Sequence, residues 1–133
     1  MNSFNGHIND VKVSGSLSLV TIGITEDVTL KTIVVETPET AEYLQKGKAI
    51  KVLFKETEVI IGIDTNLKVS LQNRIAGTVT AIEKGSLLSK VTMQSEIGEI
   101  AAIISTNAVE KLELKENTSV VALVKLNEIM LSE

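Results

Sequence analysis

A chain of 133 residues can form one ordinary domain or two very small ones, so its organisation has to come from internal pattern. Hydrophobic residues make up 44% of the chain but aromatic residues only 2%, which predicts an aliphatic core and favours β structure. The chain has no cysteine and a single histidine, His7, which excludes disulfides, thiol nucleophiles and zinc sites with cysteine ligands. The net charge of −4 argues against a nucleic-acid partner. With no basic leader and no apolar run near the roughly 18 residues of a membrane span, we expect a cytoplasmic protein without a membrane partner.

The first half of the chain is predicted to consist of short strands and one helix. β-branched runs with partial alternation, such as residues 19–24, are bounded by Gly, Asn, Asp and Ser, which is typical of strands. A helix is predicted over residues 37–44, because Thr37 before Pro38 fits an N-cap followed by proline, and Gly47 ends the helix. The next apolar run, residues 50–61, carries Lys55.

The second half repeats this order of elements. Residues 4–8 align with residues 75–79, residues 17–22 with 88–93, and residues 50–61 with 120–131 at an offset one residue smaller. Lys55 and Lys125 coincide in the last alignment, and a second helix is predicted over residues 105–112, beginning at Ser105. The joint falls near residues 62–66, so we predict two modules in tandem, residues 1–65 and 66–133.

The predicted fold class is all-β with one short helix per repeat. Several short strands and one helix in about 65 residues suit an OB-like β-barrel, in which closure removes exposed sheet edges. Units of this size bury only about 60% of their unfolded surface, so we expect pairing of the modules and oligomerisation.

The second half resembles a Mop domain of the TOBE-like kind. The family pattern S-A-R-N, an apolar residue and Gly-x-Val, then I-x-x-G, and finally a lysine before V-M-L, is matched by S-L-Q-N-R-I-A-G-T-V at 70–79, I-E-K-G at 82–85 and K-L-N-E-I-M-L at 125–131. The first half matches more weakly, through Lys55 and the ending at 58–61, and begins too late for a full S-A-R-N equivalent. The chain is similar to the tandem Mop proteins, the molbindins. This resemblance implies trimers of two-module chains that bind molybdate or tungstate between modules.

The resemblance also implies a set of binding residues, with two departures from the family pattern. The arginine of S-A-R-N is Gln72 here, and Arg74 is a candidate to replace its charge. The T-x-x-S pair at the helix start has lost one hydroxyl in the second half, at Ala108, whereas the first half keeps both. The predicted oxyanion-binding residues are Ser70, Gln72, Asn73, Arg74, Lys125, Thr37, Thr40, Ser105 and Lys55. Our hypothesis is that Ser70, Gln72, Asn73 and Lys125 of one chain face Thr37 and Thr40 of another module across an interface.

These residue types suit a tetrahedral dianion, which has four acceptor oxygens and no donors. Hydroxyls, amides, lysine and the N–H groups at a helix start all donate hydrogen bonds or supply positive charge. Without the resemblance, Thr37 and Ser105 are read as helix caps, and Lys55 and Lys125 as outward-facing lysines on edge strands. No nucleophile, base and acid can be assembled and no residues are expected to ligate a metal cation directly, so we expect a non-enzymatic binding protein.

The leading hypothesis is intracellular storage or homeostasis of molybdate or tungstate. One alternative is a sensing or accessory module of a transport or regulatory system, although the chain has neither a helix-turn-helix pattern nor a nucleotide-binding loop. Another is a structural module with decayed anion sites. Side-chain identity leaves the selectivity among molybdate, tungstate and sulfate open.

Overall fold

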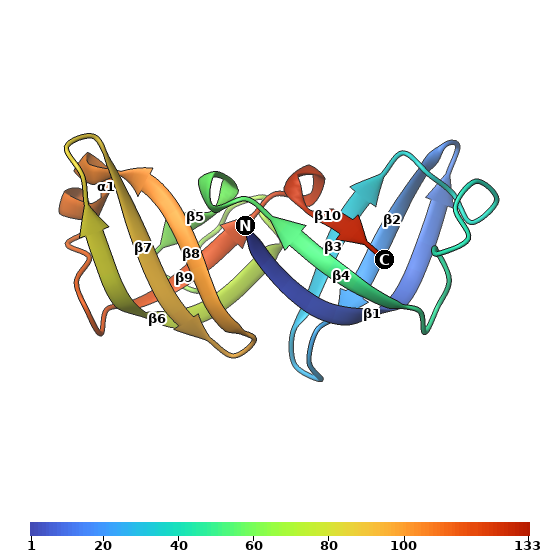
Figure 1. Ribbon diagram of the computed structural model, residues 1–133, viewed down its shortest axis with the longest axis horizontal. Helices are drawn as coiled ribbons and strands as arrows, with labels where there is room; N and C mark the ends of the chain where they lie inside the picture. The colour runs from blue at the N-terminus through green and yellow to red at the C-terminus, as the bar shows by residue number, and fades with distance from the viewer.

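The computed structural model describes residues 1–133, which form two five-stranded antiparallel sheets lying side by side (Figure 1). The first sheet, in spatial order, is β10 (Met130–Ser132), β4 (Ala49–Phe54), β1 (Asn2–Ser14), β2 (Leu17–Gly23) and β3 (Thr29–Val34). The second is β5 (Ile60–Gly62), β9 (Ser119–Val124), β6 (Asn73–Lys84), β7 (Leu88–Ser95) and β8 (Gly98–Ser105). Both sheets curve into barrel-like units, so the predicted all-β class with two OB-like barrels is confirmed.

Each half of the sequence supplies one short strand to the other barrel. The C-terminal strand β10 pairs with β4, with Met130 opposite Leu53, whereas β5 pairs with β9, with Ile60 opposite Leu123. Each barrel is therefore built from both halves of the chain. The division into residues 1–65 and 66–133 describes the sequence repeat and stays a prediction as a domain boundary.

The two long strands β1 and β6 are bent in the same way. The pairing of β1 with β2 shifts register between Ile8 and Asp10, and that of β6 with β7 shifts between Val79 and Ala81, which marks a β-bulge in each. The glycine of the Gly-x-Val pattern is required by close approach, because a Cβ on Gly77 would lie 2.5 Å from the carbonyl oxygen of Gln94.

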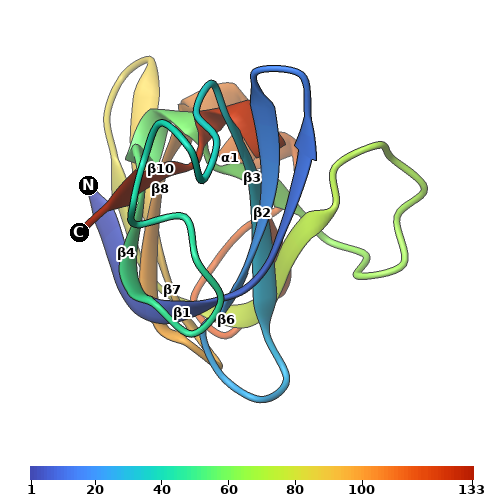
Figure 2. The same ribbon diagram turned by 90° about the vertical axis from the view of Figure 1, so that its right-hand side faces the viewer.

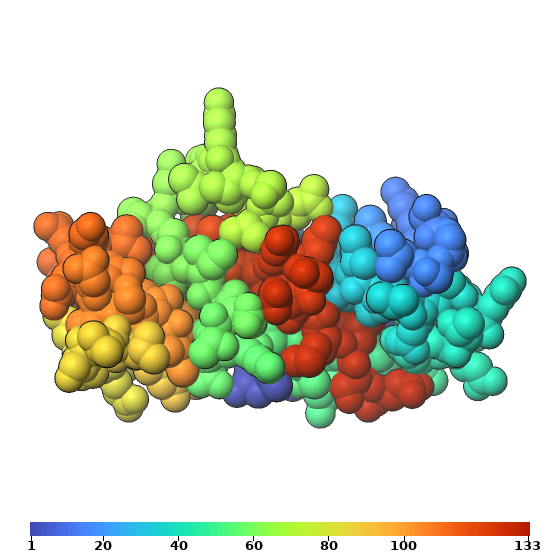
Figure 3. Space-filling view, turned by 90° about the horizontal axis from the view of Figure 1, so that it is seen from above, coloured from blue at the N-terminus to red at the C-terminus, as the bar shows by residue number.

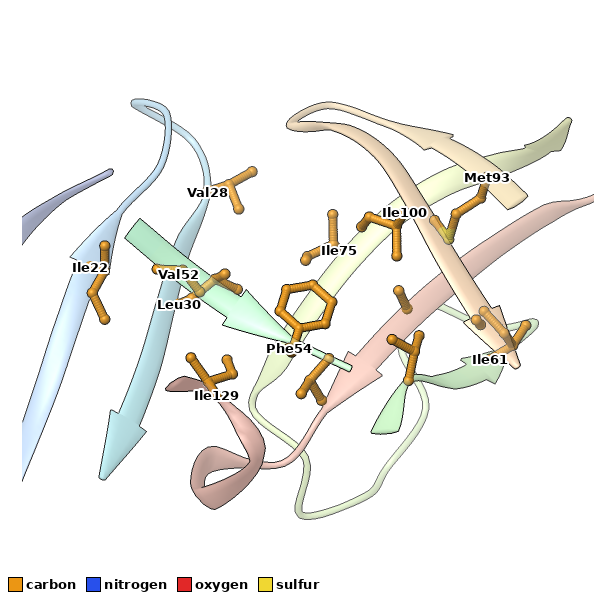
Figure 4. Packing of buried hydrophobic residues seen from close by; sticks show 14 of the residues in the cluster. Ile22, Val28, Leu30, Val52, Phe54, Ile61, Ile75, Met93, Ile100 and Ile129 are labelled. Atoms are coloured by element: carbon orange, nitrogen blue, oxygen red, sulfur yellow. The ribbon is translucent and has the colours of Figure 1, made fainter. Parts of the chain in front are cut away.

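A single hydrophobic core of 24 buried residues joins the two barrels. Phe54 is fully buried at its centre, between residues of the first barrel such as Val52 and residues of the second such as Ile75 and Ile100 (Figure 4). Its ring stacks on that of Phe4, with 5.8 Å between the ring centroids. Because the core is continuous, we expect the barrels to unfold together.

Of the two predicted helices, only the second is formed. Helix α1 (Thr106–Lys111) begins after Ser105, whose side chain accepts a hydrogen bond from the Ala108 amide at 3.0 Å, as expected of an N-cap. The helix predicted over residues 37–44 is wrong, because this segment forms consecutive turns. The Thr40 hydroxyl accepts from the Thr37 amide at 2.9 Å and donates to the Thr37 carbonyl at 3.2 Å, and such local side-chain bonds compete with helix formation.

Two short 3₁₀ turns that the sequence did not predict follow the two repeated lysines. They are η1 (Glu56–Glu58) after Lys55 and η2 (Leu126–Glu128) after Lys125. None of the helical segments has the length and apolar character needed to cross a membrane.

Candidate functional site

One pocket brings together three of the predicted binding residues, Ser70, Gln72 and Lys125. It has a volume of about 230 Å³, and its remaining lining residues are Ile33, Leu71, Leu126 and Asn127. The loop before β6, the edge strand β3 and the turn η2 meet here, and Figure 3 shows the yellow-green loop beside the red C-terminal segment and the cyan segment of the first barrel.

The pocket carries one formal positive charge and no carboxylate. Its polar groups are the Lys125 ammonium, the Ser70 hydroxyl and the amides of Gln72 and Asn127. The side chains of Ser70, Gln72 and Lys125 are exposed, so solutes reach them. An open pocket with donors and no negative charge suits a small anion and offers no general base.

Asn73 lies directly beside the pocket, but its side chain is engaged by the backbone. It is 2% exposed; its Oδ1 accepts from the Lys31 amide at 2.7 Å, and its Nδ2 donates to the carbonyls of Lys31 at 2.9 Å and Val124 at 3.1 Å. These bonds fasten β3 of the first barrel to β6 and β9 of the second. Asn73 therefore positions the Ser70–Gln72 wall and has few donors left for a ligand.

Arg74 points its guanidinium at the loop rather than into the pocket. Nε donates to the Leu71 carbonyl at 2.9 Å, Nη2 to that of Val69 at 3.1 Å and Nη1 to that of Thr65 at 3.3 Å. This loop, residues 63–72, projects from the side of the molecule in Figure 2. The three bonds give the loop a defined shape and leave Lys125 as the charged residue of the pocket.

Lys55 lies at the equivalent corner of the other barrel and lines none of the four hollows on the surface. Next to it, the Glu56 carboxylate accepts a hydrogen bond from the Met1 ammonium, which lowers the pKa of Glu56 from its ordinary value. Asn2 repeats the role of Asn73, because its amide exchanges hydrogen bonds of 2.9 Å with both the N–H and the carbonyl of Ala101 on β8.

The remaining predicted residues lie apart from the Lys125 pocket within one chain. Thr37 lines a separate hollow with Val13, Gly15, Pro38 and Glu39. The Thr40 hydroxyl bonds to Thr37, and Ser105 caps α1 at the outer end of the second barrel (Figure 1). The hypothesis that Thr37 and Thr40 reach the pocket from another module across an interface stays a prediction.

Three residues with clear structural roles here were not singled out from the sequence: Asn127, Asn2 and Thr32. Asn127 lines the pocket, and Asn2 could have been found from its offset of 71 residues to Asn73. Thr32 is a hydroxyl residue at a fully buried position of β3. The signal in the sequence was its place two residues after Leu30, on the same face of an alternating strand. No group of three or more His, Asp or Glu side chains is placed to hold a metal ion.

Known proteins resemble both the second half and the whole chain. The TOBE domain family matches residues 70–131. Molybdenum-pterin-binding protein 3 of Clostridium pasteurianum is 30% identical over 66 residues, and protein 2 of that organism is 32% identical over 66; each match covers 49% of this chain and 97% of the relative. The molybdate-bound crystal structure of the cytoplasmic molybdate-binding protein ModG matches with a TM-score of 0.91 and 28% identity, over 98% of this chain and 94% of that one.

The fold and the pocket define a class of small proteins built from two OB-like barrels in tandem, in which the second sequence repeat, residues 70–131, matches the TOBE domain family. Within that class, the chain belongs to the Mop family, which includes molybdate-binding proteins of the tandem, molbindin type. The relatives named above are binding proteins rather than enzymes.

Proposed function

We propose that this protein binds molybdate reversibly at the pocket of Ser70, Gln72 and Lys125, with tungstate as a second ligand. The observation that carries the proposal is the meeting of these three donors in one exposed pocket that no carboxylate lines. The molybdate-bound state of ModG, which matches nearly the whole chain, supports the choice of anion.

The donor set suggests how the anion is held. Lys125 supplies charge, while the Ser70 hydroxyl and the Gln72 and Asn127 amides donate hydrogen bonds to the oxygens. One lysine, one hydroxyl and two amides do not fill the acceptor capacity of four oxygens, so we infer that a neighbouring subunit completes the site with the hydroxyls of Thr37 and Thr40. This favours a homo-oligomer, for which the family resemblance suggests a trimer, acting in cytoplasmic storage or homeostasis of the anion.

A structural module with decayed anion sites is the second candidate. The specific observation in its favour is the position of Arg74, whose guanidinium bonds to three loop carbonyls instead of replacing the charge that Gln72 lacks. The two candidates differ in whether the protein binds molybdate at all.

Calorimetric titration of the oligomer with sodium molybdate separates them. We expect saturable binding, a loss of affinity of about 30-fold or more in Lys125→Met because a charge-assisted contact disappears, and less than about 2-fold in the matched variant Lys55→Met. Titration with tungstate and sulfate measures selectivity. Absence of binding by the unmodified protein would leave the decayed-site candidate.

The contribution of a second subunit is tested separately. Native mass spectrometry with and without molybdate gives the number of subunits and of bound anions. The double variant Thr37→Ala, Thr40→Ala should keep the subunit number and bind molybdate more weakly; an unchanged affinity removes both threonines from the site.

A further inference from the structure

The wall of the pocket that carries Lys125 is fastened to β3 by a buried hydroxyl. Thr32 is fully buried, and its Oγ1 lies 2.7 Å from the carbonyl oxygen of Ile129 and 3.0 Å from that of Leu126. The hydroxyl thus bridges both ends of η2, the turn that follows Lys125 and places Leu126 and Asn127 on the pocket.

The opposite wall is fastened to the preceding residue of the same strand. Asn73 bonds to the amide and the carbonyl of Lys31, and it directly follows Gln72 in the chain. The next residue of β3, Ile33, lines the pocket itself. Three consecutive residues of one edge strand therefore set the distance between the two donor-bearing walls.

The other barrel shows that the turn forms without such a hydroxyl. Thr32 stands opposite Val20 on β2, and the residue in the same register of the second barrel, opposite Val91 on β7, is Ala102. The backbone nevertheless has nearly the same angles at the two lysines, φ −72° and ψ 146° at Lys55, φ −70° and ψ 147° at Lys125. The hydroxyl is thus dispensable for the shape of the turn and is present only at the corner that has the pocket.

We propose that Thr32 is a positioning residue for the oxyanion site, which restricts the motion of η2 so that Lys125 and Asn127 stay at a fixed separation from Ser70 and Gln72. The inference rests on the proposed function. Its physical basis is preorganisation, since donors already held in place lose less conformational entropy when the anion binds.

The test compares Thr32→Val, which keeps the branched shape and removes the hydroxyl, with Thr32→Ser, which keeps the hydroxyl. Molybdate affinity should fall about five-fold in Thr32→Val, the equilibrium equivalent of one net hydrogen bond, and stay within about two-fold in Thr32→Ser. In the anion-free protein, hydrogen exchange of the Glu128 amide, which donates to the Lys125 carbonyl at 3.0 Å, should quicken in Thr32→Val. The equivalent Glu58 amide on η1, which donates to the Lys55 carbonyl, should not change.

Val91→Ala is the control for general loss of stability, because Val91 is fully buried in the other barrel, on β7, and its side chain forms no hydrogen bond. It should lower the unfolding temperature without changing Glu128 exchange or affinity at a temperature where the protein is folded. Unchanged affinity and exchange in Thr32→Val, or equal losses in Thr32→Ser or Val91→Ala, would overturn the inference while the proposed function stands. Failure of the unmodified protein to bind molybdate overturns both.

Discussion

Lys55 and Lys125 stand at equivalent corners of the two barrels, each between the end of a strand and a 3₁₀ turn, yet only Lys125 lines a pocket. The difference lies in their neighbours. Phe54 and Glu56 flank the first lysine, whereas Val124 and Leu126 flank the second. At the first corner Glu56 adds a carboxylate beside the lysine, and at the second no carboxylate lines the pocket. A shared backbone corner therefore has a pocket suited to an anion only where the surrounding side chains leave space around the lysine and add no carboxylate.

The largest expected effect concerns the residue before each lysine. Phe54→Ala should lower the free energy of unfolding by about 4 kcal/mol, because it removes a fully buried ring from the joint core, and Val124→Ala by about 2 kcal/mol. Urea denaturation followed by circular dichroism measures both. A single transition is expected in each variant; two separate transitions in Phe54→Ala would contradict a core shared by the barrels.

The next largest effects concern Asn73 and Asn2, whose side-chain amides join the two barrels. Asn73→Ala should cost about 3 kcal/mol, because three hydrogen bonds of a buried side chain are lost and three backbone groups lose that partner. Asn2→Ala removes two such bonds and should cost about 2 kcal/mol. The same denaturation experiment ranks them. Equal costs would mean that the bond from Asn73 to Val124 contributes nothing.

The charge difference between the corners is tested by making the second resemble the first. Leu126→Glu should weaken molybdate binding about ten-fold at low ionic strength, because it places a negative charge on the wall of the pocket. Leu126→Gln, of the same shape without the charge, is the matched control. If calorimetry shows equal losses in both variants, shape rather than charge distinguishes the corners.

The smallest expected effect concerns the turns between β3 and β4, which contain Tyr43; α1 occupies the equivalent place in the second repeat. Burial, and then the hydrogen bond of 2.5 Å from the Tyr43 hydroxyl to Glu36, raise the pKa of Tyr43 above its usual range. Because the pKa of Tyr43 is higher in the folded than in the unfolded state, its protonated hydroxyl contributes to stability. That contribution is complete below the unfolded pKa, about 10, and is lost as the pH rises above it. The unfolding temperature should therefore fall less steeply between pH 8 and 11 in Tyr43→Phe than in the unmodified protein. Identical slopes would show that the bond does not persist in solution.

Local pattern in the sequence was enough to predict much of this protein. Period-two alternation marked the strands, the offset between residues 4–8 and 75–79 revealed the repeat, and Ser105 correctly marked a helix start. The family pattern placed the S-L-Q-N segment and Lys125 in one candidate site, although Lys125 follows the last residue of that segment, Asn73, by 52 residues. These features depend on neighbours along the chain or on a recurring motif, which a single sequence contains.

Only the tertiary structure decided which segments meet. The exchanged strands β5 and β10 occupy equivalent places in the repeat, so their local sequences are compatible with pairing inside either barrel, and only the folded chain shows that each pairs in the other barrel. Likewise, the amide of Asn73 meets Lys31 and the hydroxyl of Thr32 meets Ile129 across long stretches of chain. Partners for buried polar groups are chosen by packing in three dimensions, because a buried donor or acceptor must be satisfied by whichever group the fold brings near.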